Sequence, residues 1–463
     1  MFKKIFKDKK NIVIISVLGA FLILGATYAL INWTSNNYRV AIRSTCMNIN
    51  YSNGQDIDTN INAINESQFI NGNTLTVSPD MVFSTVSIEI DDACSDVEGL
   101  GTIEINVSDL SEQLKIGGKY ANSLRYTIVE YDPTDYVNLN MTELSGDTFI
   151  ILSSGIIINE GIKEIYYPYL THGEIHNYLI FFYADNTLFD NSLLDLTFEG
   201  TISAKVEQFI PTPITSFNYT ISGENIVLTS YKGTDTIVKV SPTYMVNDVE
   251  YNTLVANTLF KSKTIVEEVY FASGVLSQNG NAQNMFMGCS SLTKVINLPN
   301  NITSLDGTFY NCTSLVNAPL IPYSVTDMAS TFYNCTRLVN APVIPNSVTS
   351  LSSTFSGCTR LVNAPVIPNS VTKMNSAFSG CTSLVNVPEI PSSVTDMSYT
   401  FRNCINLEGL VRINSSLVTT ASASTSNPFY YTSKPITVEV PSGSTTYTNI
   451  NKNKPSNVTI VQY

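Results

Sequence analysis

The stretch "CTRLVNAPVIPNSVT" occurs twice without a change, at residues 335–349 and again at residues 358–372. The two copies begin 23 residues apart, and the same spacing continues on both sides of them. The period is marked by six cysteines, which are Cys289, Cys312, Cys335, Cys358, Cys381 and Cys404. A fixed period of this length predicts a solenoid in which each repeat forms one turn.

Apolar columns accompany the cysteines. A phenylalanine stands three residues before each of them and a leucine three residues after it, giving Phe286, Phe309, Phe332, Phe355, Phe378 and Phe401 with Leu292, Leu315, Leu338, Leu361, Leu384 and Leu407. Further columns run from Leu298 to Ile413, from Ile302 to Leu417, and from Leu305 to Met397, and the last of these is interrupted at Thr420. One unit buries too little apolar surface to fold alone, so the turns must stack. We therefore expect Phe309, Phe332 and Phe355 to form a single internal file.

Each turn has a predictable course. The segment "LVNAPVIP" predicts a short strand, Pro-Asn-Ser a turn, "VTSLSS" a second strand, and "TFSGC" a tight helical turn. A proline column consisting of Pro319, Pro342, Pro365 and Pro388 falls inside the first strand. Proline lacks the N–H that a ladder needs, so we expect this strand to be bent or shortened.

The pattern F-x-x-C-x-x-L, followed by I-P-x-S-V-T, resembles the BspA-type leucine-rich repeats of bacterial surface proteins over residues 286–417. The resemblance implies a leucine-rich-repeat solenoid that binds host extracellular proteins or other cells. Residues 216–285 resemble the N-terminal cap and first turns of such domains, and residues 418–463 resemble their C-terminal cap. Caps are physically required because an open end would expose a sheet edge.

The first 33 residues form a separate segment, with five lysines among the first ten and an uncharged, mostly apolar run at residues 12–31. A helix of that length spans about 30 Å, the thickness of a hydrocarbon core. The positive-inside rule then predicts a cytoplasmic segment at 1–11, an anchor at 12–33 and an extracellular remainder. The alternative is a signal peptide cleaved near Ala29, since "LGATYALINWTS" resembles the signal segment of exported Gram-positive proteins of the TasA and camelysin kind.

Residues 37–208 contain six segments rich in β-branched and alternating apolar residues: "TVSIEI", "GTIEINV", "LRYTIVEY", "DTFIILSSGIII", "NYLIFFYAD" and "LTFEGTISAKVEQ". They predict an antiparallel β-sandwich, and its last strands resemble those of TasA and camelysin. Residues 209–215, with two prolines, predict a stiff linker to the solenoid. The fold class is therefore mainly β, with an N-terminal transmembrane or signal helix.

Only 14% of the residues are charged, and the net charge is −13. An acidic surface repels phosphate backbones, which argues against a nucleic-acid partner. The sequence contains no nucleophile elbow, Walker loop or dinucleotide fingerprint in a suitable context, so we expect a non-enzymatic protein without a cofactor.

Several side chains are candidate sites with a simpler structural alternative. Cys46 and Cys94 are candidates for a disulfide in an exported domain, whereas the six repeat cysteines favour free buried thiols filling a narrow corner. In the motif "HGEIH", His172 and His176 stand four apart as in a zinc helix, but Glu174 does not directly follow the first histidine and no helical signal surrounds the motif, which favours an exposed loop over a metal site. The asparagine column of Asn317, Asn340, Asn363 and Asn386 favours a hydrogen-bonded ladder over a ligand site.

Tyr310, Tyr333, Arg337 and Arg360 stand at variable positions beside the cysteines. Tyrosine and arginine are enriched in binding hot spots, so these four residues are the candidate partner surface, with solvated decoration as the alternative. The sequence thus predicts a surface adhesion or ligand-binding protein for a host extracellular protein or a cell-surface glycan. The alternative function is a structural subunit of an extracellular matrix or filament, assembled through the TasA-like sandwich.

Overall fold

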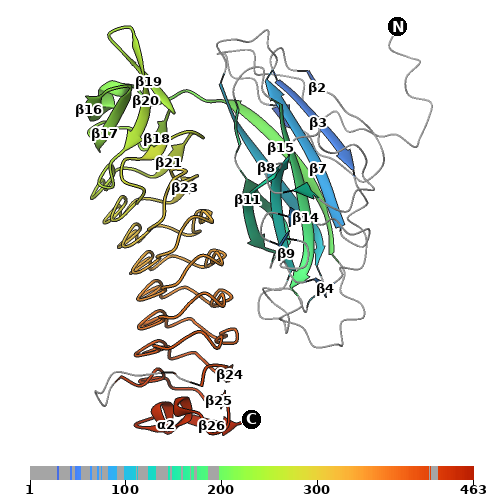
Figure 1. Ribbon diagram of the computed structural model, residues 1–463, viewed down its shortest axis with the longest axis vertical. Coiled ribbons are helices and arrows are strands. Elements are labelled where there is room, and N and C mark those ends of the chain that lie inside the picture. Colours follow the sequence, from blue (N-terminus) through green and yellow to red (C-terminus); the bar gives the residue numbers. More distant parts are fainter. Residues whose placement is uncertain are drawn as a thin grey trace, which may run out of the picture.

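The computed structural model forms two bodies joined near residue 209, one built of strands and one of stacked turns (Figure 1). It describes residues 198–416, 418 and 426–463. Before residue 198 it describes the strands given below, together with Glu98, Glu112, Ile157, Glu160 and Pro168.

The strand-built body contains two larger sheets, in which every pairing but one is antiparallel. The first has the order β1-β15-β8-β12, with β13 also paired to β8; its strands are β1 (Ala29–Leu30), β8 (Gly99–Leu110), β12 (Gly161–Tyr166), β13 (Tyr169–Leu170) and β15 (Phe198–Gln208). The second has the order β11-β9-β14-β7-β3-β2, with β4 also paired to β14; its strands are β2 (Ile42–Arg43), β3 (Met47–Asn53), β4 (Ala63–Ile64), β7 (Val82–Ile90), β9 (Leu124–Tyr131), β11 (Phe149–Ile156) and β14 (Ile175–Asp185). A small sheet joins β5 (Ile70–Asn71), β6 (Thr74–Leu75) and β10 (Leu144–Ser145).

All six segments predicted as strands lie on strands, namely β7, β8, β9, β11, β14 and β15. Their alternating pattern places every second side chain on one face. On β15, for example, Ile202, Ala204 and Val206 are all buried. The prediction of a mainly β chain is confirmed, and α2 (Thr445–Asn451) is the only α-helix in the described part of the chain.

The predicted N-terminal anchor is corrected at its end. Ala29 and Leu30 form the strand β1, where Ala29 pairs with Val206 and Leu30 with Lys205. These two residues satisfy their backbone groups in a sheet and do not extend a helix. Residues 12–28 and 31–33 lie outside the described residues, and no described helix is long and apolar enough to cross a membrane.

The solenoid opens with two sheets of short strands. A sheet of order β16-β17-β20-β19, with β22 paired to β20, contains β16 (Phe217–Ser222), β17 (Asn225–Tyr231), β19 (Thr243–Val246), β20 (Val249–Val255) and β22 (Leu276–Ser277). A parallel sheet contains β18 (Ile237–Val240), β21 (Glu268–Phe271) and β23 (Lys294–Ile296). The parallel order of this second sheet is the ladder on which the later turns continue (Figure 1).

Successive turns stack in register. The amide of Phe309 donates to the carbonyl of Thr331 at 2.8 Å, and the amide of Phe332 donates to that of Thr354 at 2.9 Å. The repeat phenylalanines are buried, and their rings stack on one another with centroids 5.2–5.7 Å apart and planes within 8°. The single internal file of Phe309, Phe332 and Phe355 is confirmed.

Two strands were predicted in each turn, and this prediction is wrong for the middle repeats. There the turns pair through isolated parallel bridges, such as Asn340 with Asn363 and Ser350 with Lys373. Ile296 and Val411 occupy the proline column in the outer turns, and those turns contain the true strands β23 and β24 (Gly409–Arg412). Proline therefore shortens the strand as expected, because it removes a ladder donor.

The predicted tight turn is a series of backbone bonds from residue i+3 to residue i, such as Tyr310 N to Gly307 O and Cys312 N to Phe309 O. Two positions in each turn take a left-handed backbone, five residues and one residue before the cysteine. The position before the cysteine holds Gly or Asn in every repeat, with φ between 54° and 78°. These residue types tolerate that conformation at the lowest cost.

The last turns are closed by β25 (Ile436–Val440), α2 and β26 (Val458–Gln462), and both strands continue the parallel ladder from β24. Ser444 caps α2 by accepting a hydrogen bond from the amide of Tyr447. Leu417 and Thr420, the last members of two predicted columns, lie outside the described residues.

The predicted linker 209–215 is anchored by two buried residues, Phe209 and Thr212, and it includes the start of the short 3₁₀ turn η3 (Ile214–Ser216). Phe209 is buried and packs edge-on against Tyr169, with ring centroids 5.2 Å apart. The amide and hydroxyl of Thr212 bond to the backbone of Lys239, and its carbonyl accepts from the Tyr244 hydroxyl. One apolar cluster runs from Leu100 and Tyr169 through Phe217 to the end of the solenoid.

Candidate binding surface

One edge of the solenoid carries all four predicted contact residues. We define the cysteine edge as the residues from five positions before each repeat cysteine to three positions after it. Its phenylalanine, cysteine and leucine side chains point into the core and are buried. The positions between them face solvent and differ from turn to turn, so this edge combines a fixed interior with a variable surface.

The cysteines hold this edge to the turn before it. Each thiol donates to the carbonyl of a phenylalanine 26 or 29 residues earlier, as Cys335 does to Phe309 at 3.1 Å and Cys358 to Phe332 at 3.1 Å. All six are free and buried, as predicted. Burial raises the pKa of Cys289 and Cys404 to about 12 and raises the pKa of the other four thiols as well. These thiols are therefore structural and unreactive.

A buried threonine column was not predicted from the sequence. Thr308, Thr331, Thr354 and Thr400 precede the phenylalanines and are fully buried. Each hydroxyl donates to a carbonyl of the preceding turn, as Thr354 does to Met328 at 2.8 Å. The repeated "TF" pair was the available signal, but threonine alone does not distinguish a buried position from an exposed one.

The structure brings Tyr310 and Tyr333 together. Their rings stack with centroids 4.6 Å apart and planes within 3°. The next two members of this column are Ser356 and Ser379. Tyr310 covers one face of Tyr333, and the neighbour beyond the other face is small.

Arg337 and Arg360 occupy the same position in consecutive turns, and both are exposed. The threonines that precede these arginines join the two turns, because the Thr359 hydroxyl donates to the Thr336 carbonyl at 3.2 Å. Their backbones therefore lie one ladder step apart, about 4.8 Å. Among the described residues, neither guanidinium has a carboxylate partner.

A second cluster on this edge was not predicted. The guanidinium of Arg402 lies 5.8 Å from the ring centres of both Tyr399 and Tyr431, within cation–π range of each. Tyr399 holds a left-handed backbone with φ of 61°, which is unusual for a bulky residue. Tyr431 follows residues 419–425 in the sequence, where the 23-residue period is lost, so the period does not predict its place in this cluster.

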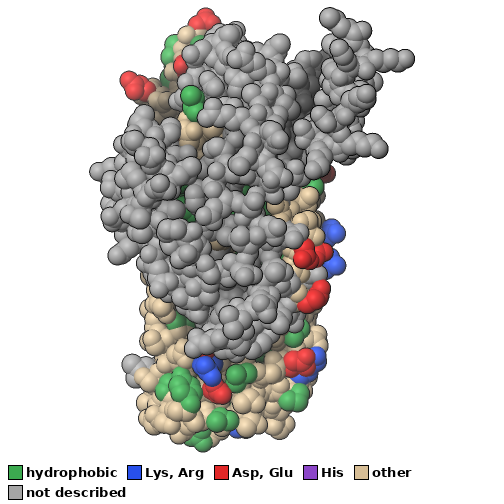
Figure 2. All heavy atoms as spheres, turned by 90° about the vertical axis from the view of Figure 1, so that its right-hand side faces the viewer, with side chains coloured by type: hydrophobic (Ala, Val, Ile, Leu, Met, Phe, Trp, Pro, Cys, Tyr) green, Lys and Arg blue, Asp and Glu red, His purple; other side chains and the backbone are tan. Residues whose placement is uncertain are grey.

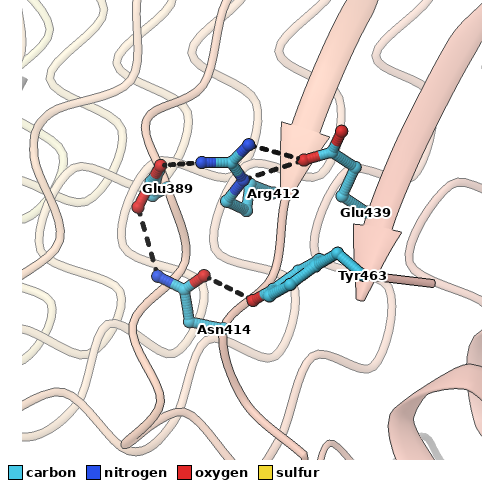
Figure 3. Close-up of polar contacts among 5 residues, drawn as sticks. All are labelled: Glu389, Arg412, Asn414, Glu439 and Tyr463. Atoms are coloured by element: carbon cyan, nitrogen blue, oxygen red, sulfur yellow. Dashed lines mark hydrogen bonds and ion pairs between the residues drawn. The ribbon is translucent and has the colours of Figure 1, made fainter. Parts of the chain in front are cut away.

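A different arginine is paired by the chain itself (Figure 3). Glu389, Arg412 and Glu439 fall at one position of three consecutive turns, and Arg412 bonds Glu389 at 3.1 Å and Glu439 at 2.7 Å. Asn414 donates to Glu389, and the hydroxyl of Tyr463 donates to Asn414 at 2.9 Å. Because every residue in this network has a partner within the chain, we assign it to fastening the C-terminal turns.

The asparagine column forms the predicted ladder in part. The Asn340 amide donates to the Asn317 side chain at 3.4 Å, and that of Asn386 donates to Asn363 at 3.5 Å. On the face drawn in Figure 2, much of the described solenoid surface consists of neutral polar side chains and backbone. Charged side chains line its right-hand margin, and hydrophobic and further charged side chains lie towards its lower end.

Of the other predicted site residues, His176 is the one that the structure describes. His176 is half-buried on β14 and not in an exposed loop, so that expectation is corrected; its Nδ1 lies 2.6 Å from Glu130 Oε1. Sheet pairing with β7 holds this segment extended, which the motif "HGEIH" does not show. His172, Cys46 and Cys94 lie outside the described residues, and the disulfide stays a prediction. The described part of the chain contains no cluster of residues suited to a metal ion.

Comparison with known proteins identifies the repeats. The family model described as a BspA type leucine rich repeat region matches in six copies, over residues 279–408 and 352–458. Residues 279–458 thus form a BspA type leucine rich repeat region. The resemblance to TasA and camelysin, and the filament alternative that depends on it, stay predictions.

Three solved structures are similar. The leucine-rich repeat protein of T. pallidum shares 24% identity, with 43% of this chain and 91% of that chain covered and a TM-score of 0.35. A leucine-rich repeat protein from Bacteroides ovatus shares 15% identity over 55% of this chain and 100% of that one, with a TM-score of 0.28. A leucine rich cell surface protein from Faecalibacterium prausnitzii shares 15% identity over 55% and 94%, with a TM-score of 0.19. No curated protein matches the chain.

Proposed function

We propose that the chain is a bacterial surface protein that binds a host extracellular protein or a cell-surface glycan through its solenoid. The observation that carries the proposal is the cysteine edge, where rigid in-register turns present half-buried tyrosines and exposed arginines at repeated positions. A prebuilt surface loses little conformational entropy on binding. The same scaffold accepts changes at its outward positions, since only the inward columns are needed for stacking.

The test is a binding screen of the full-length chain against matrix proteins and glycans. The control removes residues 335–380, which are two whole repeats, so that Cys381 takes the place of Cys335 and both caps remain. We expect saturable binding to at least one target and its loss in the shortened chain. Binding that is equal in the two chains, or binding to no target, would contradict the proposal.

A further inference from the structure

The cysteine edge differs in charge from the rest of the molecule. The whole chain has 38 acidic and 25 basic residues. The edge, in all six repeats, contains no Asp or Glu and has three arginines, Arg337, Arg360 and Arg402. A positive strip on an acidic protein attracts anions to that strip and repels them elsewhere.

The backbones of Arg337 and Arg360 lie one ladder step apart, and both exposed side chains carry a positive charge. At about 5 Å in water two such charges repel by about 1 kcal/mol, and more where solvent is partly excluded. The chain does not relieve this repulsion with a described carboxylate, although acidic residues outnumber basic ones. Arg412 shows the contrast, because a glutamate in the turn before and another in the turn after neutralise it (Figure 3). The unpaired positions suit an anion supplied by a partner.

The surroundings of the arginines favour a sugar chain over a protein. The edge contains the partly exposed polar side chains of Thr336, Thr359, Ser356 and Asn334, and the outer face of the Tyr333 ring. The hydroxyls of Thr359 and Ser356 donate to backbone carbonyls and keep their lone pairs as acceptors for a ligand. Protein interfaces have an apolar core. Among the described residues of this edge, Ile405 is the only large aliphatic side chain that is exposed. A pyranose ring has one apolar face, which stacks on an aromatic ring, and hydroxyl groups around its rim.

We infer that the cysteine edge binds an acidic polysaccharide, whose carboxylate or sulfate groups pair with Arg337 and Arg360 while a neighbouring sugar ring packs beside Tyr333. Guanidinium groups pair with such oxyanions through two parallel hydrogen bonds. The repeat of one turn, about 4.8 Å, is close to the length of one sugar residue along a chain. This inference rests on the proposed function and names the class of its ligand.

The experiment measures binding of heparin, a sulfated polysaccharide, to the full-length chain by calorimetry, with uncharged dextran as the negative probe. Arg337→Ser and Arg360→Ser test the site, because serine stands naturally at this position in Ser291, Ser314 and Ser383. Lys373→Ser is the matched control, since it removes one exposed positive charge from a column that already contains Ser304 and Ser350.

We expect heparin binding that weakens with salt, and no binding of dextran. Each arginine variant should bind about tenfold more weakly, the loss of one charged hydrogen-bonding group, and the double variant weaker still. Lys373→Ser should stay within about twofold of wild type, because a single exposed charge at a distance is largely screened. Unchanged melting curves establish that the arginine variants are folded.

Heparin affinity that is equal in wild type and the double variant would overturn the inference. So would polyglutamate binding as tightly as heparin with the same loss in the variants, because the partner would then be an acidic peptide. If a matrix protein binds wild type and the double variant equally but not the chain lacking residues 335–380, the proposed function stands and this inference fails.

Discussion

At the scale of single residues, the repeat cysteines show why one residue type recurs six times. Alanine would also fit a narrow corner, but the thiol adds a weak donor that reaches the phenylalanine carbonyl of the preceding turn. Each thiol is thereby held neutral in the core. Because burial raises the folded-state pKa above the unfolded value of about 8.5, the neutral thiol stabilises the fold fully only below that unfolded value.

This arrangement predicts sensitivity to alkali. As the pH rises from about 8 towards the folded pKa of about 12 of Cys404, the unfolded state loses its proton first, and stability falls. Between about pH 8 and pH 10, we expect the free energy of unfolding, measured with urea, to fall by about 1–2 kcal/mol less in Cys404→Ala than in wild type. Thr354→Ala, which removes a buried group that does not titrate, should lose as much as wild type. Equal losses in the cysteine variant and wild type would contradict this account.

At the scale of one turn, the left-handed position before the cysteine offers a matched pair. Gly357 and Gly380 have φ of 76° and 77°. A Cβ at Gly357 would overlap the Asn334 Oδ1, whereas at Gly380 nothing comes closer than 3.7 Å. Both alanine variants carry the left-handed penalty of about 1–2 kcal/mol. We expect Gly357→Ala to destabilise further, and Asn334→Gly to remove the difference, in a double-mutant cycle of thermal unfolding. A Gly380→Ala cost equal to that of Gly357→Ala would show that the clash is absent.

The same scale shows what a sequence can predict. The columns follow from a constant offset of 23 residues, so the positions from Phe286 to Phe401 are predictable from the sequence alone. Phe260 and Phe429 extend the same stack, with ring centroids 5.3 and 5.5 Å from their neighbours. They lie 26 and 28 residues from the next phenylalanine, so the 23-residue offset does not find them. Regular strands failed as a prediction because proline occupies the ladder position in the middle turns.

Some residues of the candidate site could be predicted from the sequence and others could not. Tyr310, Tyr333, Arg337 and Arg360 were accessible from sequence because variable positions beside a fixed cysteine must face outward. The cluster of Arg402 with Tyr399 and Tyr431 was not, since Tyr431 reaches it only through the three-dimensional path of the terminal turns. Charge pairing of Arg412 likewise depends on Glu439, which lies 27 residues away in the sequence.

At the scale of the whole molecule, the segment that the sequence marks as a linker contributes Phe209 to the apolar cluster that continues into the solenoid. Phe209 is 3% exposed and contacts Tyr169, while its neighbour Ile210 is 68% exposed. Continuous apolar packing of this kind fixes the angle between the two bodies, whereas a solvated linker would leave them free to rotate. The solenoid is therefore held at a set orientation to the strand-built body.

This joint yields the final prediction. Phe209→Ala should remove about 3–5 kcal/mol of packing at the joint, and we expect a larger radius of gyration in solution X-ray scattering and protease cleavage within residues 209–215. Ile210→Ala is the control, because that side chain packs against little, and it should behave as wild type in both measurements. If Phe209→Ala kept the scattering profile and the protease resistance of Ile210→Ala, the hydrogen bonds of Thr212 to Lys239 and Tyr244 would suffice to hold the joint, and the apolar packing would not be its cause.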